Sequence, residues 1–595
     1  MQRRALTLTG LVLVLLSPVV PPADAGSSPA VSLALSPAVV TYGSSQDATG
    51  YVMADSPCPS GRTVDLQQRP SGSVTWATID TATSDTNGSF GFASLQPDST
   101  ASYRAVAEPA VTGGTTCDQL TSPAERGLVR AAVTFTLAHT SVPAGSCTKG
   151  AVRVRPTKAG QQVTIQERGT SGWRALRTLT LDASSNAVTT FCERWVDIGR
   201  HRLRATWTKQ DDVNATGSSP ASVLSVVRAA WMRHIGQMIG GRTVGVSIRA
   251  KGSVLYERGA TSPFAPASNE KLPLSMALLD HMGPGHRIDT VAAAGPVRHG
   301  VIRGNLWILG HGDPSTGPGQ LKALAGAIAG AGIKRIKGRV MGSTTYFAHD
   351  WWAPGWKPSF PHDEIPLPSA LTFKGNRIDG RNVAHPELFA AKALFDRLRA
   401  RGIAIGGHRP GYGAPPSGLT AVAAVHSVPL SGLLRHMDRT SDNFYAEVLG
   451  KGLAASVHGP PGTIAHGAGA IAAWARAHGA NAALYDSSGL SYRDRITPHG
   501  LTRLLQVSSS TTWGSVLRRA LPAAGQGTLH GRHLAGVKLH AKTGTLDNIS
   551  ALSGWVWLSK VGTWAQFSIL DRGMGYTTAK DLEDAIVRTT ASSAH

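Results

Sequence analysis

The amino-acid sequence predicts a chain of several domains, with two β-sandwich repeats followed by a larger mixed α/β region. Three observations support this prediction. The chain has 595 residues, which is too long for a single hydrophobic core. A β-type sequence pattern occurs twice in the first third of the chain. Near residue 222 the pattern changes to strand-like stretches that alternate with Ala-rich helical stretches.

The N-terminus has the features of a targeting segment. Arg3 and Arg4 precede an apolar run over residues 6–20, and the small-x-small sequence Ala23-Asp24-Ala25 follows it. A buried helix or an uncleaved anchor is the alternative, but the run is short for a membrane span and contains proline. We therefore expect residues 1–25 to be a signal peptide and the mature protein to be exported.

Two copies of one pattern follow this segment. GRTVDLQQR at residues 61–69 and GQQVTIQER at residues 160–168 share G-x-x-V-x-[LI]-Q-x-R, at a period of about 100 residues. Apolar and polar residues alternate in both copies, and turn residues intervene, which is typical of β-sandwiches. Both segments resemble the Ig-like modules of exported bacterial proteins. We expect one such repeat at residues 30–128 and a second at residues 129–224, acting as spacers or wall-binding modules.

The four cysteines all lie in these repeats. Outside the cytoplasm an even number of cysteines favours disulfides, and the absence of C-x-x-C spacing argues against zinc and thioredoxin-like chemistry. We expect one bridge in each repeat, Cys58–Cys117 and Cys147–Cys192. Because the rest of the chain has no cysteine, any nucleophile there must be another residue.

The formal net charge is +22 at pH 7. Such a basic balance often indicates a nucleic-acid partner, but export argues against nucleic acid here. Anionic cell-envelope polymers are the expected partners, and a generally basic, solvated surface is the alternative interpretation.

Residues 225–595 have a mixed α/β pattern. A helix is predicted over residues 223–239, and a hairpin over residues 244–256 with its turn at Lys251-Gly252. Further helices are predicted at residues 321–331, 389–400 and 578–589, and an apolar strand at residues 549–558.

Three short motifs in this region form an ordered set. They are S-x-x-K at residues 268–271, S-x-N at residues 441–443 and K-T-G at residues 542–544. By itself S-x-x-K is a weak signal, because residues 146–149 match it too and a helix-capping serine beside a solvated lysine is the ordinary interpretation. The complete set, in this order and in one domain, is the active-site set of penicillin-recognising serine enzymes.

The first two motifs supply groups that acyl transfer requires. A serine hydroxyl is a weak nucleophile until a base removes its proton, and Lys271 lies one helical turn from Ser268. Lys271 must be neutral to act as that base, and burial together with a nearby cation such as Lys542 would lower its pKa. Ser441 can pass a proton to a leaving amine, and Asn443 can hold a substrate amide.

The third motif leads into the predicted strand. An edge strand can pair with an extended peptide by β-augmentation, and Gly544 lies at the start of this edge. Lys542 and Thr543 offer a cation and a hydroxyl to a carboxylate. The backbone N–H groups of Ser268 and Thr545 would form an oxyanion hole.

The region from about residue 225 to 590 resembles the D-Ala-D-Ala carboxypeptidase/endopeptidase family of low-molecular-mass, class C penicillin-binding proteins. The segments that carry the resemblance are PASNEKL, GHGDPS, TSDNFYAEVL, DSSGLSYRDRITP, GQGTLHGR and AKTGTLDNISALSGWV. The resemblance implies an α/β serine transpeptidase fold of the penicillin-binding/β-lactamase type with an inserted domain. It also implies a cell-wall or membrane-surface enzyme that acts on peptidoglycan stem peptides and is acylated by β-lactam antibiotics.

The resemblance also assigns roles to individual residues. Ser268 is implied to be the acylated serine, Lys271 the proton acceptor, and Ser441 and Asn443 the second catalytic element. The substrate-side strand is implied to contain Lys542, Thr543, Gly544 and Thr545. No cofactor is implied, and because the histidines lack ligand spacing we expect no required metal.

One departure from the family pattern concerns the insert at about residues 285–430. It looks shorter than usual, so one inserted domain is expected to be missing or reduced. The aromatic residues between 346 and 360 are expected to form a small separate core, with a ligand platform as the alternative.

Two other functions stay open at this point. A β-lactamase-like hydrolase uses the same motifs but deacylates rapidly. A non-catalytic cell-wall-binding protein would combine the repeats with an inactive domain. The segment match and the intact motif residues both favour the carboxypeptidase/endopeptidase.

Overall fold

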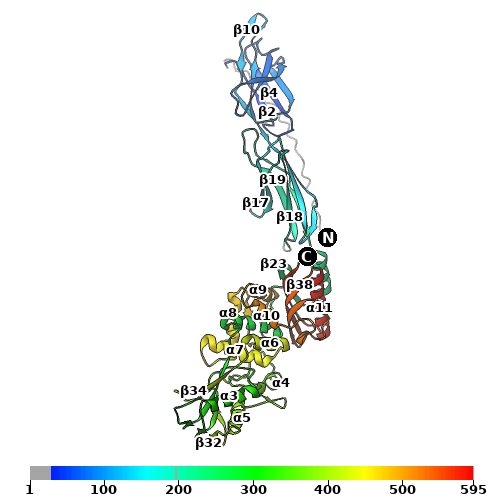
Figure 1. The fold of residues 1–595 in the computed structure, drawn as a ribbon. Helices are drawn as coiled ribbons and strands as arrows, with labels where there is room; N and C mark the ends of the chain where they lie inside the picture. The colour runs from blue at the N-terminus through cyan, green and yellow to red at the C-terminus, as the bar shows by residue number, and fades with distance from the viewer. Residues whose placement is uncertain (1–27, 195–196, 594–595) are drawn as a thin grey trace, which may run out of the picture. The chain divides into compact units, whose positions relative to one another are not determined.

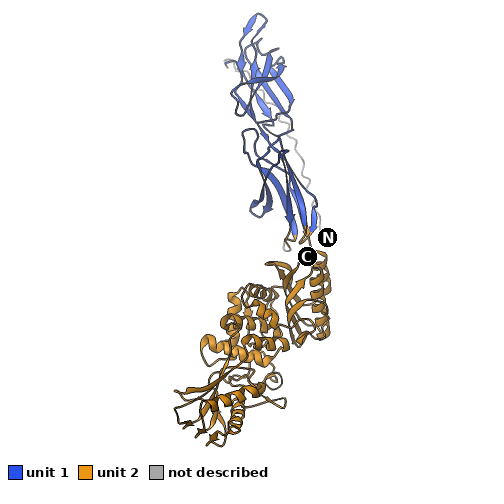
Figure 2. Ribbon diagram, viewed as in Figure 1, with its two compact units in different colours: residues 1–142, 147–192, 199–225 blue, residues 143–146, 193–198, 226–595 orange. Residues whose placement is uncertain are grey.

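The structure of the protein is a computed structural model that describes residues 28–194 and 197–593 (Figure 1). The predicted signal peptide, residues 1–25, lies outside the described residues. The chain divides into two compact units (Figure 2). The first ends at Ser225, and the second contains the chain from Val226 onward together with two short segments that precede residue 199.

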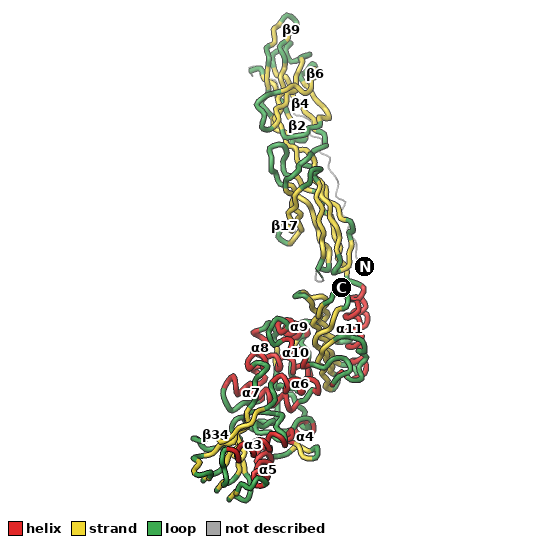
Figure 3. The backbone as a smooth tube through the Cα atoms, in the orientation of Figure 1, coloured by secondary structure: helices red, strands yellow, loops and turns green. Residues whose placement is uncertain are grey.

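Among its described residues the first unit has strands joined by loops and turns, and no helix (Figure 3). Its first repeat has one sheet in which β1, β2 and β7 pair with β4, and a second sheet in the order β3-β12-β8-β5-β6 with β11 beside β8. The strands are β1 (Ala30–Val31), β2 (Ala34–Ser36), β3 (Val39–Thr41), β4 (Gln46–Met53), β5 (Thr63–Pro70), β6 (Ala77–Thr83), β7 (Ser89–Leu95), β8 (Ala101–Ala107), β9 (Ala110–Thr112), β10 (Thr115–Cys117), β11 (Leu120–Thr121) and β12 (Glu125–Arg130).

The second repeat has the same plan. One sheet has the order β13-β15-β18, and the other has the order β14-β21-β19-β16-β17 with β20 beside β19. The strands are β13 (Ala132–Leu137), β14 (Ser141–Pro143), β15 (Cys147–Arg155), β16 (Gln162–Gly169), β17 (Gly172–Thr180), β18 (Asn186–Cys192), β19 (Gly199–Trp207), β20 (Gly217–Ser218) and β21 (Ser222–Val227).

Alternation of apolar and polar residues explains the two-sheet packing. Along β4 every second residue is buried, and β15 alternates in the same way. In the first repeat the buried residues of both sheets form one core, which includes Val52 and Phe90 from one sheet and Leu66 and Tyr103 from the other. Each repeat is therefore a β-sandwich, and its Ig-like type stays a prediction.

The residues shared by the two sequence repeats form the same local packing in both. Arg104 donates from Nε to Gln67 Oε1 at 2.9 Å, and its guanidinium lies 4.5 Å from the centre of the Trp76 ring. In the second repeat Arg204 donates from Nε to Gln166 Oε1 at 2.8 Å, and its guanidinium lies 4.2 Å from the centre of the Trp173 ring. The conserved spacing within the chain thus reflects a repeated structural unit.

Each repeat contains one disulfide, at the expected pairs. Cys58 is bonded to Cys117, and Cys147 is bonded to Cys192. The second pair joins residues that face each other on the neighbouring strands β15 and β18.

The second unit contains an antiparallel sheet in the order β23-β22-β39-β38-β37. Helices α1 and α11 cover one face of the sheet, and α9 packs on the other (Figure 1). The elements are α1 (Ala230–Ile239), β22 (Val244–Ala250), β23 (Ser253–Arg258), α9 (Pro498–Ser508), β37 (Leu539–Leu546), β38 (Ile549–Leu558), β39 (Thr563–Arg572) and α11 (Tyr576–Ser593). Strand β37 is an edge strand.

The helix predicted from residue 223 is wrong in its first turns. Residues Ser222–Val227 form β21, which belongs to the second repeat, and the helix α1 begins only at Ala230. The stretch is rich in valine, and Leu224 and Val226 are buried on one face of the strand. β-Branched residues with this period favour a strand over a helix.

A helical region and the insert complete the unit. The helices share a core with the sheet, and the insert has a core of its own, formed mainly by α3, α5 and two small sheets. The helices are α2 (Lys271–Met282), α3 (Pro318–Gly330), α4 (Phe360–Asp363), α5 (Pro386–Arg399), α6 (Leu430–Thr440), α7 (Asn443–His458), α8 (Ile464–Ala477) and α10 (Gly514–Ala520), with 3-10 turns η1 (Ala267–Glu270), η2 (Lys374–Asn376) and η3 (Gly527–Leu529).

The insert sheets have the orders β33-β29-β27-β24-β34 and β25-β26-β28-β32, and two short hairpins, β30-β31 and β35-β36, complete the described elements. Their strands are β24 (Asp289–Ala294), β25 (Val297–Arg298), β26 (Val301–Ile302), β27 (Leu306–Gly310), β28 (Arg335–Ile336), β29 (Val340–Ser343), β30 (Arg377–Ile378), β31 (Arg381–Asn382), β32 (Ala404–Ile405), β33 (Gly411–Gly413), β34 (Thr420–His426), β35 (Ala482–Ala483) and β36 (Arg495–Ile496). Within the described helices none is long and apolar enough to cross a membrane.

The aromatic residues between 346 and 360 mainly form a small separate core. Phe347, Trp356 and Phe360 are buried and pack with Phe444 and Leu490. Phe444 lies on α7, and Leu490 lies in the loop between β35 and β36. This core therefore joins the insert to two segments that contribute to the site described next.

Candidate active site

Ser268 lies on the turn η1, which leads directly into α2. The preceding residue, Ala267, has a φ of +47°, a conformation that side chains rarely adopt. Two close backbone approaches hold this turn. A Cβ atom on Gly489 would lie 1.9 Å from the carbonyl oxygen of Ala267, and one on Gly544 would lie 2.8 Å from that of Pro266. The serine is therefore fixed between a loop on one side and strand β37 on the other.

Lys271 has no exposed surface and a full set of hydrogen-bond partners. Its Nζ donates to Ser268 Oγ at 3.0 Å, to Asn443 Oδ1 at 2.8 Å and to the backbone oxygen of Ser488 at 2.6 Å. The first two motifs therefore meet at one lysine. The carbonyl and amide oxygens can only accept, so a neutral Lys271 can keep both as acceptors and direct its lone pair to the Ser268 hydroxyl.

Ser441 and Lys542 form a second contact between motifs. Ser441 ends α6 in the left-handed conformation, with a φ of 58°, and its Oγ accepts a hydrogen bond from Lys542 Nζ at 2.7 Å. Lys542 also donates to the backbone oxygen of Thr543 at 2.9 Å and has no exposed surface. The S-x-N and K-T-G motifs are thus joined through one ammonium.

Burial shifts the pKa of both lysines downward. It lowers the pKa of Lys271 to about 8, against the attraction of nearby carboxylates such as Asp486 and Glu447. Burial also lowers the pKa of Lys542 well below its usual value, and the charge of Lys271 adds to this effect. The two lysines therefore titrate as a coupled pair.

The Asn269 side chain anchors the nucleophile turn to the sheet. It is buried, and its amide fits with the NH₂ group donating to the backbone oxygen of Lys542 at 2.7 Å and the oxygen accepting from Ser553 Oγ at 2.8 Å. Ser268 and the edge strand are consequently held in fixed relation.

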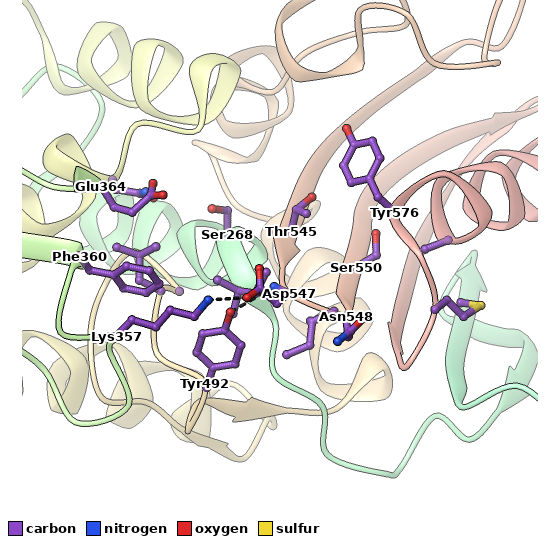
Figure 4. A pocket seen from close by; sticks show the side chains of 17 residues that line it. Ser268, Lys357, Phe360, Glu364, Tyr492, Thr545, Asp547, Asn548, Ser550 and Tyr576 are labelled. Carbon is purple, nitrogen blue, oxygen red and sulfur yellow. Dashed lines mark hydrogen bonds and ion pairs between the residues drawn. The ribbon is translucent and has the colours of Figure 1, made fainter. Parts of the chain in front are cut away.

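A cavity opens beside Ser268 (Figure 4). Thr545 and Tyr576 lie on one side of it, and Phe360 and Lys357 lie on the other. Thr543 is buried, whereas Thr545, two residues further along the same strand, is exposed to the cavity. A peptide in this cavity would lie along the free edge of β37.

Charged and aromatic groups close the far side of the cavity. Lys357 pairs with Asp547, and the backbone N–H of Asp547 donates to the Tyr492 hydroxyl at 3.1 Å. Lys357 and Phe360 come from the insert, and Asp547 follows β37. The insert therefore supplies one wall of the cavity.

Two buried carboxylates missed in the sequence analysis hold the loop that contacts Lys271. Glu447 accepts from the backbone N–H groups of Ser487 and Ser488 at 2.9 and 2.8 Å. Asp486 accepts from those of Gly489 and Ser491 at 2.8 and 2.9 Å. Burial, followed by the charge of Asp486, raises the pKa of Glu447 to about 8. These bonds position the carbonyl that accepts from Lys271.

Asp438 is a third buried acid near the two lysines. Its Oδ2 accepts from Ser275 Oγ at 3.0 Å, and it has no exposed surface. Burial raises its pKa to about 7, while the charges of Lys542 and Lys271 oppose the rise. In the sequence, an aspartate on the otherwise apolar face of α6 is the signal that could have identified this position.

Glu270, Asp486 and Asp494 form a compact group of carboxylates, with one oxygen of each within 4.8 Å of the others. Oxygen donors of this kind suit Mg²⁺ or Ca²⁺. However, burial and mutual repulsion raise the pKa values of Glu270 and Asp494 well above the usual range. Raised pKa values favour protonated carboxyl groups, which are poor ligands for a cation, and the sequence prediction of no required metal stays a prediction.

All the predicted catalytic and substrate-binding residues lie in the second unit around this cavity. The cysteines lie in the first unit. The other S-x-x-K match, residues 146–149, spans the start of β15 in the second sandwich, where Ser146 immediately precedes the disulfide-bonded Cys147. K-T-G occurs only at residues 542–544 of the sequence, so this second match lacks the complete set of motifs.

A serine hydroxyl, a buried lysine hydrogen-bonded to it, and a second serine–lysine pair define a serine hydrolase with a lysine base. The chain belongs to the D-Ala-D-Ala carboxypeptidase 3 (S13) family, whose model matches residues 233–379 and 367–593. It is a serine-type peptidase, and the predicted membership of the class C penicillin-binding family is confirmed.

Two curated relatives and one solved structure illustrate this relationship. The chain is 30% identical over 374 residues to carboxypeptidase DacB of Mycolicibacterium smegmatis, covering 57% of this chain and 78% of the relative. It is 27% identical over 431 residues to the D-alanyl-D-alanine carboxypeptidase of Actinomadura sp. (strain R39), with the same coverage. Penicillin-binding protein 4 of Haemophilus influenzae has a similar fold, with a TM-score of 0.54, 20% identity, and coverage of 60% of this chain and 99% of that one.

Proposed function

We propose that this protein is an exported D-alanyl-D-alanine carboxypeptidase/endopeptidase that cleaves peptidoglycan stem peptides through an acyl-enzyme on Ser268. The observation that carries the proposal is the 3.0 Å hydrogen bond between Lys271 Nζ and Ser268 Oγ, in a site that also holds the Lys542–Ser441 pair. Family membership and the two carboxypeptidase relatives support the same substrate class.

The acylation half of the reaction begins at Ser268. Neutral Lys271 takes the hydroxyl proton as Ser268 Oγ attacks the carbonyl carbon of the peptide bond between the two D-alanines. The N–H groups of Ser268 and Thr545 stabilise the oxyanion. When the C–N bond breaks, the leaving amine takes a proton through Ser441.

Deacylation and substrate binding use the same groups. Water attacks the ester carbonyl, a base takes one water proton, and this proton passes to the Ser268 oxygen as the ester C–O bond breaks, which regenerates the enzyme. Asn443 holds the substrate amide, while Lys542 and Thr543 bind its carboxylate. Gly544 lets β37 lie close to the nucleophile turn, and the peptide pairs with this edge strand.

We further propose that β-lactam antibiotics acylate Ser268, and that the signal peptide, residues 1–25, directs export. The sandwiches at residues 30–128 and 129–224 then act as Ig-like modules outside the cell, and residues 225–595 form the catalytic domain. The net charge of +22 favours anionic envelope polymers as their neighbours.

A fluorescent penicillin and a soluble peptide ending in D-Ala-D-Ala test the proposal. We expect covalent labelling and release of D-alanine, and loss of both in Ser268→Ala. Ser146→Ala is the matched control, because it changes the other S-x-x-K serine and should keep both activities. Label that survives Ser268→Ala would overturn the assignment. A label lost within seconds would instead identify a β-lactamase, and a protein that neither labels nor cleaves would be a wall-binding protein.

A further inference from the structure

The segment GQGTLHGR, residues 525–532, has no role in the mechanism above. In the structure its centre forms η3, next to the end of α6 and to β37. Gly527 has a φ of +47°, and a Cβ atom there would lie 2.3 Å from the carbonyl oxygen of Arg439. The turn is therefore packed directly against the end of the helix that carries Ser441, so its side chains have fixed positions relative to the site.

Thr528 extends from this turn to the K-T-G motif. Its Oγ1 accepts a hydrogen bond from Thr543 Oγ1 at 2.8 Å. Thr528 is partly exposed and lines a cavity of about 520 Å³ on the side of Ser268 away from the insert. The same cavity is lined by Ser268, Ser441, Thr543, Thr545 and Lys580. A leaving group released from a Ser268-bound substrate would occupy this side of the site.

In this structure one of the two threonine hydroxyls, that of Thr528, is free to donate a hydrogen bond. Each threonine hydroxyl has one O–H donor, and the proton of Thr543 is used in the bond to Thr528. Within residues 28–194 and 197–593 no group accepts the proton of Thr528. An oxygen anion beside the pair would accept a hydrogen bond from the Thr528 hydroxyl. The Thr543 hydroxyl could also rotate and donate to the anion instead of to Thr528.

The charged groups that line this cavity are largely paired with one another. Lys580 lines it, and its Nζ donates to the backbone oxygen of Gly544 at 3.1 Å. The carboxylates that also line the cavity are paired: Arg532 donates to Asp584 at 2.7 Å, and His533 Nδ1 lies 3.3 Å from Asp581. Lys580 is itself paired with Glu583 at 3.8 Å, so the hydroxyl donors, rather than the net charge of the lining, favour a carboxylate.

We propose that Thr528 is a specificity-determining residue whose hydroxyl binds, together with that of Thr543, the carboxylate of the leaving D-amino acid. This inference rests on the proposed function and adds a residue to its substrate-binding groups. The fixed turn η3 makes the contact selective, because a substrate without the carboxylate offers the Thr528 hydroxyl no charged acceptor for its hydrogen bond.

The test compares substrates with and without this carboxylate. A peptide ending in D-Ala-D-Ala and its C-terminal amide are assayed with the wild-type chain, Thr528→Val, Thr528→Ser and Thr578→Val. Thr578 is an exposed threonine on α11 outside the cavity and serves as the matched control. We expect Thr528→Val to lose roughly 10- to 100-fold in kcat/KM on the acid, the worth of a hydrogen bond to a charged group. The amide should change by less than about threefold, and Thr528→Ser and Thr578→Val should resemble the wild type on both.

Equal losses on acid and amide would show that Thr528 only supports the fold and would overturn the inference, as would unchanged activity on the acid. Thr528→Ala provides the same comparison if Thr528→Val fails to fold. A second arm compares acylation by penicillin with that by its methyl ester, so the role of Thr528 is tested even if the chain labels but releases no D-alanine. A wild-type chain that neither labels nor hydrolyses would overturn the proposed function, and this inference with it.

Discussion

At the scale of single residues, the site works through burial of charged groups that ordinary proteins keep in water. Lys271 and Lys542 have no exposed surface, and their ammonium groups are placed by hydrogen bonds rather than by solvent. Desolvation lowers the pKa of Lys271 to about 8, so a fraction of the chains carries the neutral amine near neutral pH. Burial thus supplies the activation that a Ser–Lys pair requires.

The first residue-scale prediction concerns the protonation of Lys271. Because only the neutral amine can accept the Ser268 proton, the rate of penicillin acylation should rise with pH through about 8 and then level off. Lys271→Arg should lower the rate roughly 100- to 10,000-fold, since a guanidinium does not lose its proton in this range. Stopped-flow or timed labelling from pH 5.5 to 9.5 measures both effects. A flat profile in the wild-type chain would contradict the role of Lys271 as the base.

The second residue-scale prediction concerns Asp438. At pH 8 this buried acid is mostly ionised, since its pKa is about 7, and its charge stabilises the protonated forms of both lysines. Asp438→Asn keeps an acceptor for Ser275 but removes the charge, so the midpoint of the acylation profile should move to lower pH, by roughly half a unit or more. Ser275→Ala removes the same hydrogen bond but keeps the carboxylate. Because that bond lowers the pKa of Asp438, its loss should move the midpoint in the same direction but by less than Asp438→Asn does. A midpoint that moves upward would contradict the electrostatic explanation.

At the scale of elements, the loop over residues 486–491 joins the nucleophile turn and Lys271 to α7, and it shows what the sequence could predict. The motif residues were predicted because each motif is a short local pattern, such as the one helical turn between Ser268 and Lys271, and because the three motifs follow one another in a known order. The contacts of this loop with Lys271, Glu447 and Ala267 join positions far apart in the chain, for which sequence spacing contains no signal. The roles of Glu447 and Asp486 were missed for this reason.

Element types were predictable to the extent that periodicity was clear. The alternation that gave the β-sandwiches is regular, as in β15, where every second residue is buried. Residues 222–227 form an apolar, valine-rich stretch that is followed closely by a true helix. Hydrophobic periodicity alone therefore did not separate β21 from α1. Pairing with β14 and β19, which is a tertiary contact, decided the outcome.

The element-scale prediction concerns the packing of this loop against the nucleophile turn. Gly489 has a φ of +79°, and a Cβ atom there would lie 1.9 Å from the Ala267 oxygen. Gly489→Ala should lower the free energy of unfolding by about 2 kcal/mol or more and slow acylation, because Ser268 must move. Gly283→Ala is the control for backbone strain, with a φ of +81°, a ψ of 155° and open space around its Cβ, so it should cost about 1–3 kcal/mol and leave acylation normal. Equal effects of the two changes would show that backbone strain, not the close approach, matters.

At the scale of the whole molecule, the disulfides and the catalytic groups lie in different compact units. Reduction should therefore destabilise the sandwiches by about 2–5 kcal/mol for each bridge while residues 226–593 remain acylatable by penicillin. Circular dichroism melting in the presence and absence of reductant, alongside labelling, measures the two responses. A Cys117–Cys147 bridge in non-reduced peptide mapping would overturn the assignment of one bridge to each sandwich.

The last prediction concerns catalysis without the sandwiches. A truncated chain that begins at Arg228, after β21, keeps every group around Ser268 as well as the sheet and α11. We expect its kcat/KM on a soluble D-Ala-D-Ala peptide to equal that of the full mature chain. On intact sacculi it should release D-alanine more slowly, because modules that hold the enzyme near its polymer raise the effective concentration of substrate. If a folded truncation loses peptide hydrolysis, the sandwiches take part in the active site. Equal rates on sacculi would leave the sandwiches the role of spacers.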